Sequence, residues 1–86
     1  MQHVDGNALA GPFAEFFAFD MTTATTRCNG CGNMAELARA MVYATGMGSV
    51  VRCDGCGQVL ATLVESDDRA WLGFSGVSAI EVRREA

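Results

Sequence analysis

The chain has 86 residues, 50% of them hydrophobic, and its ten acidic and six basic side chains give a formal charge of −4. This length predicts a single domain over residues 1–86, with a core so small that a metal ion or disulfides are expected to stabilise it. All six basic residues are arginine, and they form no basic run. Because nucleic-acid backbones attract basic surfaces, this composition argues against a direct nucleic-acid partner.

The sequence also argues against a membrane or secreted protein. No apolar stretch approaches the roughly 18–20 residues that are needed to span a bilayer. The first five residues lack the positive charge that begins a signal peptide. We therefore expect no membrane association and a cytoplasmic location, where cysteines stay reduced.

The first segment, residues 5–20, is predicted to be helical. Apolar side chains recur there at the spacing of one helix face, at Leu9, Phe13, Phe16 and Phe17. We expect a helical turn and then a helix over about residues 12–18, with Asp5 or Asn7 as the cap at the start. Pro12 either kinks one helix or begins a second one.

Four phenylalanines lie in or next to this predicted helix: Phe13, Phe16, Phe17 and Phe19. We interpret them as the face that packs on a sheet and completes the core. The alternative is that they dock into a groove of a partner protein. Trp71, further along the chain, has the same two interpretations, as a core residue or as the anchor of a binding face.

The second segment, residues 21–57, holds all four cysteines. Met21–Thr26 is rich in threonine and predicts a strand. Residues 33–45 fit both the apolar stripe of a helix and the alternation of a strand. Because a glycine-rich turn and a valine pair follow, a hairpin over about residues 36–53 is the simpler interpretation.

The third segment, residues 58–86, predicts a β-meander of three strands. The strands are expected at Val59–Glu65, Ala70–Phe74 and Ala79–Arg84. A polar turn of Ser, Asp, Asp and Arg separates the first two, and a Ser-Gly pair ends the second.

The strongest signal is a near-repeat of seven residues, which reads Thr-Arg-Cys-Asn-Gly-Cys-Gly at 26–32 and Val-Arg-Cys-Asp-Gly-Cys-Gly at 51–57. Two cysteines three apart on a tight turn direct both sulfurs to one side, as tetrahedral coordination requires. Glycines before and after the second cysteine permit positive φ, and such turns aim N–H groups at the sulfurs. These glycines are Gly30 and Gly32 in the first turn and Gly55 and Gly57 in the second.

Two such turns supply four thiolates, from Cys28, Cys31, Cys53 and Cys56. One Zn²⁺ ion per chain, bound by the four sulfurs, is the expected outcome. The 21 residues between the two pairs leave room for a hairpin. A site filled by four protein ligands has no open position for water or substrate, so we expect a structural site and no enzymatic activity. Arg27 and Arg52, each beside the first cysteine of its turn, are placed to offset part of the thiolate charge.

Two alternatives use the same cysteines. Paired Cys-x-x-Cys-Gly turns also resemble rubredoxin, a one-iron electron carrier, and thiolate sites accept either metal. However, only Tyr43 supplies an aromatic ring between the pairs, and neither turn is followed by an aromatic residue. Thiol redox chemistry would normally use a single pair at a helix N-terminus. His3, the only histidine, lies in the N-terminal tail, so no Cys–His nucleophilic pair is expected.

The whole sequence resembles a family of short, uncharacterised bacterial proteins classed as a domain of unknown function. The resemblance covers nearly all of residues 4–83. Its most specific parts are the segment Asp-Gly-Asn-Ala-Leu-Ala-Gly-Pro at 5–12 and the two cysteine turns. It implies a zinc-ribbon-like fold with the four cysteines as ligands, and it implies no activity.

These observations predict a small mainly-β zinc-ribbon domain, with a short N-terminal helix (residues 5–20), two cysteine turns (21–57) and a C-terminal β-meander (58–86). We expect a zinc-stabilised module that binds another protein through exposed sheet edges or through the phenylalanine-rich helix. A homodimer through an edge strand is a further possibility. Nucleic-acid binding would need the arginines to cluster, among them Arg27, Arg52, Arg83 and Arg84.

Overall fold

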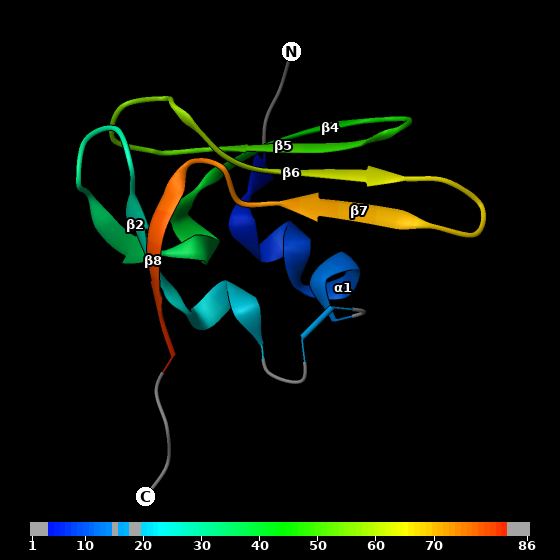
Figure 1. Ribbon diagram of the computed structural model, residues 1–86, viewed down its shortest axis with the longest axis horizontal. Helices are drawn as coiled ribbons and strands as arrows, with labels where there is room; N and C mark the ends of the chain where they lie inside the picture. Colours follow the sequence, from blue (N-terminus) through cyan, green and yellow to red (C-terminus); the bar gives the residue numbers. More distant parts are fainter. Residues whose placement is uncertain (1–3, 15, 18–19, 83–86) are drawn as a thin grey trace, which may run out of the picture.

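Two antiparallel sheets form the fold, and helical turns of the N-terminal half lie under one face of the larger sheet (Figure 1). The computed structural model describes residues 4–14, 16–17 and 20–82. The predictions that concern His3, Phe19, Arg83 and Arg84 therefore fall outside the described residues.

The larger sheet has five strands in the order β1-β4-β5-β6-β7. These are β1 (Val4–Asp5), β4 (Met41–Thr45), β5 (Gly48–Arg52), β6 (Val59–Glu65) and β7 (Ala70–Gly73). The smaller sheet has three strands in the order β3-β2-β8. These are β2 (Thr25–Cys28), β3 (Met34–Glu36) and β8 (Val77–Glu81). The helical pieces are η1 (Gly6–Leu9), α1 (Ala10–Phe13), η2 (Met21–Thr23) and η3 (Leu37–Arg39).

The N-terminal segment begins its helical turns where the sequence predicts, but its α-helix is shorter and earlier than the predicted helix over 12–18. The Asp5 carboxylate accepts a hydrogen bond from the Asn7 N–H at 3.0 Å and so caps η1. The helix α1 ends at Phe13. The helix starts before Pro12 and includes it in its first turn. This is possible because N–H groups of the first turn have no acceptor within the helix, so the N–H that proline lacks costs no hydrogen bond. Among the described residues, no helix is long and apolar enough to cross a membrane.

The core lies between the inner face of the five-stranded sheet and these turns, and two of the predicted phenylalanines, Phe13 and Phe17, pack in or against it. Phe13 is 1% exposed, and its ring centroid lies 5.9 Å from that of Phe17 and 6.0 Å from that of Phe74. Phe16, in contrast, is 37% exposed. The other large buried side chains are Leu9, Met21, Leu37, Val42, Val51, Leu60 and Leu63.

The hairpin predicted over residues 36–53 is confirmed as β4 and β5, which pair from Met41 with Arg52 to Thr45 with Gly48. Residues 33–45 are neither one helix nor one strand, because they contain β3, η3 and β4. The strand predicted over Met21–Thr26 is wrong in its first half. The Asp20 carboxylate accepts hydrogen bonds from the N–H and the hydroxyl of Thr22, at 3.0 and 2.6 Å, and this cap begins η2 instead.

The predicted C-terminal meander is also wrong, because β8 leaves the sheet that holds β6 and β7. It pairs with β2 of the three-stranded sheet, with Thr26 opposite Ile80. Gly76 lies at the crossing, the point where the chain passes from the five-stranded to the three-stranded sheet. Its N–H donates to the Leu60 carbonyl at 3.0 Å, and its carbonyl accepts from the Asn29 N–H at 2.7 Å. A Cβ at this position would collide with the Val59 carbonyl oxygen, so only glycine passes so close to β6.

This close approach makes a testable prediction. Gly76→Ala should destabilise the protein by at least about 2 kcal/mol, since a methyl group forced against backbone strains the crossing. In a thermal unfolding experiment the midpoint should fall by about 10 °C or more. Gly46→Ala is the control, since a Cβ there meets no atom within 4 Å. Equal midpoints for the two variants would contradict this account of the crossing.

Candidate metal centre

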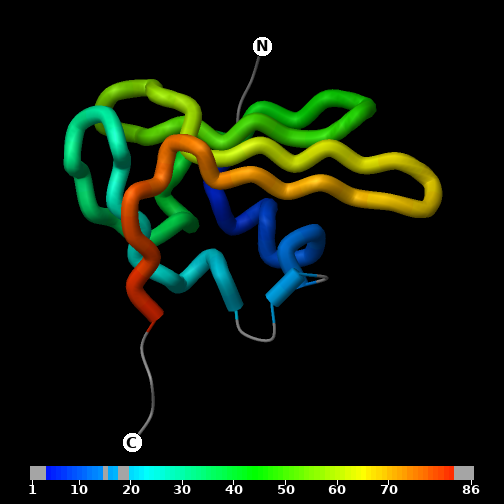
Figure 2. The backbone as a smooth tube through the Cα atoms, viewed as in Figure 1, coloured from blue at the N-terminus to red at the C-terminus, as the bar shows by residue number. Residues whose placement is uncertain are grey.

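The four cysteines lie on two hairpin turns that belong to different sheets. The first turn (residues 28–33, knuckle 1) joins β2 to β3 of the three-stranded sheet, and the second (residues 53–58, knuckle 2) joins β5 to β6 of the five-stranded sheet. Figure 2 shows the two turns side by side, in teal after β2 and in yellow-green after β5. The fold therefore brings together segments that the sequence separates by a whole hairpin.

Both knuckles have the same backbone construction. The N–H of the first cysteine donates to the carbonyl of the residue after the repeat, from Cys28 to Asn33 at 2.9 Å and from Cys53 to Gln58 at 2.8 Å. The carbonyl of the first cysteine accepts from the second glycine of the turn, Gly32 or Gly57, at 2.9 Å in each case. The strand register also shifts shortly before each first cysteine, between Arg27 and Cys28 where β2 pairs with β8, and between Val51 and Arg52 where β5 pairs with β6.

The glycine prediction is half right. Gly32 and Gly57 have φ of 75° and 79°, a conformation that favours glycine. Gly30 and Gly55 are not among the positive-φ residues, so their predicted conformation is wrong. Gly30 instead leaves room for a neighbour, since a Cβ there would collide with the Gln58 side chain, whereas a Cβ at Gly55 would only make an ordinary contact, 3.6 Å from the Asn33 amide nitrogen.

The sulfur atoms fit a tetrahedral metal ion. The Sγ atoms of Cys28, Cys31, Cys53 and Cys56 all lie within 4.8 Å of one another. The Sγ–Sγ distances across the knuckles are 3.6 Å from Cys28 to Cys56 and 3.8 Å from Cys31 to Cys53. Four sulfurs about 2.3 Å from a central Zn²⁺ would be about 3.8 Å apart, so the cluster already has the required size.

The two knuckles present their cysteines in the same way. Cys28 and Cys53, the first of each pair, are both 2% exposed, whereas Cys31 and Cys56 are exposed. Each close sulfur pair thus joins a buried cysteine of one sheet to an exposed cysteine of the other. A metal held here would tie the two sheets together at the edge of the core.

The electrostatics of the metal-free site lower the pKa of one cysteine, Cys28, and raise the pKa of two others, Cys31 and Cys56. The pKa of Cys28 is lowered to about 7, chiefly because the Cys31 N–H donates to its sulfur, an effect that outweighs desolvation. The pKa of Cys56 is raised to about 12: the Gln58 N–H lowers it, but desolvation and the neighbouring sulfurs raise it more. The pKa of Cys31 is raised for similar reasons, against the lowering effect of the Asn33 N–H. A cation between the sulfurs would therefore favour the thiolate forms of Cys31 and Cys56.

Metal binding should consequently depend on pH. The metal takes thiolates, so protons still held by the metal-free thiols must leave when it binds. The Cys28 thiol, with a pKa of about 7, is deprotonated at pH 8, whereas Cys56, with a pKa of about 12, still holds its proton. Apparent zinc affinity should rise with pH and fall most steeply below about pH 7, where Cys28 also protonates. Competition with a chromophoric chelator at several pH values measures this, and a flat profile would contradict it.

The two arginines beside the knuckles differ in what they contact. The Arg52 guanidinium donates to the Gly57 carbonyl at 2.9 Å and so braces knuckle 2. Arg27 is exposed on β2. Two further residues at the site, Asn33 and Gln58, are not among the residues predicted from the sequence. The signal for them is their equivalent position, since each is a carboxamide that directly follows one copy of the repeat.

Comparison with known proteins gives a family and no activity. The model of a family of unknown function, DUF6510, matches residues 1–85. No curated protein matches the chain, and no solved structure matches it.

Proposed function

The chain belongs to the DUF6510 family, and we propose that it is a non-enzymatic protein-interaction module of the zinc-ribbon type, held together by one structural zinc ion. The observation that carries the proposal is the convergence of four cysteine sulfurs, within 4.8 Å of one another, from hairpin turns of two different sheets. All four coordination positions come from the protein, as in structural zinc sites. The metal adds a link between the two sheets, and its binding free energy contributes to the stability of a small domain.

Zinc is proposed over iron because, unlike in rubredoxin, only Tyr43 supplies an aromatic ring between the cysteine pairs and no aromatic residue follows either turn. A tetrahedral set of four thiolates suits Zn²⁺ and also suits iron. An electron carrier would need iron, and a thiol redox protein would need metal-free cysteines. The cluster geometry is compatible with each of these, so the identity of the metal is the first quantity to measure.

The test is metal analysis of protein purified without chelator or added metal, together with its visible spectrum. One zinc per chain and no colour support the proposal. Iron with visible thiolate absorption overturns it in favour of electron transfer. No metal, with free or oxidised thiols, overturns it in favour of thiol chemistry.

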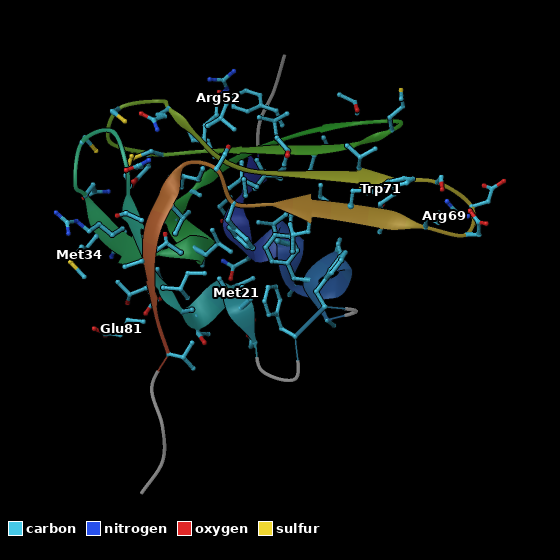
Figure 3. The ribbon with its side chains drawn as sticks, viewed as in Figure 1. Met21, Met34, Arg52, Arg69, Trp71 and Glu81 are labelled. Carbon is cyan, nitrogen blue, oxygen red and sulfur yellow. The ribbon has the colours of Figure 1, made fainter. Side chains whose placement is uncertain are left out.

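The surface proposed for the partner is the outer face of the five-stranded sheet. Successive side chains of a strand point to opposite faces of the sheet, and Leu72 packs against the core. Its neighbour Trp71 therefore lies on the outer face, where it is 53% exposed. Its cross-strand neighbour Val64 is 42% exposed. Tyr43 and Val50 are paired across β4 and β5 on the same face. Figure 3 shows Trp71 near the β6–β7 turn, on the side of the sheet away from α1.

Charge indicates the kind of partner. The turn that ends this face carries exposed Glu65, Asp67 and Asp68 against one arginine, Arg69, which lies 3.9 Å from Asp68. A protein segment with apolar side chains flanked by arginine or lysine fits an aromatic and aliphatic face with an acidic end. An indole face also attracts such cations directly.

The surface assignment is tested by comparing two exposed aromatic residues. Trp71→Ala should abolish binding of the partner that copurifies with the wild-type protein, without changing the unfolding midpoint. Phe16→Ala, on the N-terminal segment, should leave binding unchanged. The reverse result would place the interface on the phenylalanine-rich segment and overturn the assignment to the sheet.

A further inference from the structure

We infer that Asn33 and Gln58 are positioning residues that together control how long the metal is retained. Each closes its own knuckle through its backbone carbonyl and places its side-chain carboxamide against the opposite knuckle. The inference rests on the proposed metal site and concerns how this chain's own residues hold it.

Asn33 connects knuckle 1 to knuckle 2 through its side chain. Its carbonyl accepts the Cys28 N–H at 2.9 Å, which closes its own turn. Its amide nitrogen donates to the Asp54 carboxylate at 3.2 Å and faces the Cys53 sulfur at 4.0 Å. The same nitrogen lies over Gly55, 3.6 Å from where a Cβ would be. One side chain therefore contacts three consecutive residues of the other sheet's turn.

Gln58 makes the corresponding connection in the opposite direction. Its carbonyl accepts the Cys53 N–H at 2.8 Å, which closes knuckle 2. Its carboxamide occupies the space above Gly30 of knuckle 1, where a Cβ would collide with its Oε1. Since Gly30 does not have positive φ, what glycine provides at this position is room for Gln58.

The physical effect of these contacts falls on the sulfurs. An N–H directed at a thiolate stabilises its charge, and Cys53 receives the Gly55 N–H at 3.3 Å as well as the Asn33 amide. The two carboxamides also fix one turn against the other, so the four sulfurs stay at metal-binding separation while the metal is bound. Without them, thermal separation of the two turns would let ligands leave one at a time.

The experiment measures the rate at which zinc passes from the loaded protein to an excess of chromophoric chelator. Asn33→Ala and Gln58→Ala should each release zinc about tenfold faster than wild type, the lower end of the effect of outer-shell residues on metal sites. Asn29→Ala is the matched control, since it removes a carboxamide from between the cysteines of knuckle 1, and its rate should equal that of wild type. Asn33→Asp, which loses the N–H donor and adds a charge beside Asp54, should be at least as fast as Asn33→Ala.

A second readout separates positioning from a general loss of stability. In protein loaded with Co²⁺, the sulfur-to-metal charge-transfer bands report the sulfur environment, and they should shift in Asn33→Ala and stay unchanged in Asn29→Ala. Gly30→Ala should displace the Gln58 carboxamide and reproduce the release rate of Gln58→Ala. The double variant that combines Gly30→Ala with Gln58→Ala should then release zinc no faster than either single variant. Additive increases in the release rate would contradict the contact between Gln58 and Gly30.

The outcomes distinguish this inference from the proposed function. A wild-type protein that binds neither zinc nor cobalt overturns the metal site itself. A wild-type protein that binds both, with Asn33→Ala and Gln58→Ala equal to it in release rate and cobalt spectrum, overturns only the positioning role.

Discussion

Replacing Cys53 by serine is expected to unfold the protein at room temperature. Cys53 is 2% exposed and supplies one of the four clustered sulfurs, which come from turns of the two sheets and are the proposed metal ligands. Metal binding in small domains of this kind contributes on the order of 10 kcal/mol to folding. A domain of this size has a total stability near the low end of about 5–15 kcal/mol, so it cannot lose most of that contribution and stay folded. Far-UV circular dichroism and its temperature dependence measure the effect.

The control separates the lost ligand from the lost buried thiol. Wild-type protein treated with a strong chelator should unfold in the same way as Cys53→Ser, and added zinc should restore wild type only. A Cys53→Ser variant with an unfolding midpoint within about 5 °C of the wild-type value would show that the sheets are held together without the metal.

Phe13→Ala is expected to have the second-largest effect. Phe13 is 1% exposed, and its ring contacts those of Phe17 and Phe74, so it joins the N-terminal segment to the end of β7. Removing a buried phenylalanine ring costs about 3–5 kcal/mol, through lost apolar contact and the cavity that remains. In a domain of this size the unfolding midpoint should fall by more than about 12 °C.

Phe16→Ala provides the comparison, because this ring is 37% exposed and lies three residues away. Its effect should be under about 1 kcal/mol, as for other partly exposed side chains. Equal destabilisation by both substitutions would mean that the N-terminal segment packs with a different face.

The sequence predicts best those features that depend on local spacing. The bounds of β6 agree with the predicted Val59–Glu65, because alternation and β-branched residues mark this strand clearly. The β4–β5 hairpin follows from the glycine-rich turn between two apolar runs. The cysteine cluster follows from the repeat alone, since the same turn occurring twice implies four sulfurs at one point.

The features that the sequence does not predict depend on contacts between distant residues. The pairing of β8 with β2 joins positions far apart in the sequence, such as Thr25 and Glu81, and nothing in the alternation of residues 77–81 indicates the partner strand. The close approach at Gly76 that redirects the chain is visible only once β6 is in place. The same holds at the cysteine cluster, where the side chains of Asn33 and Gln58 reach the knuckle opposite their own.

X-ray absorption at the metal edge of the purified protein tests the central claim most directly, because it counts the sulfur ligands and measures their distances. We expect zinc with four sulfur neighbours at about 2.3 Å and no nitrogen or oxygen ligand. A shell containing nitrogen or oxygen, or fewer than four sulfurs, would contradict a closed site formed by Cys28, Cys31, Cys53 and Cys56.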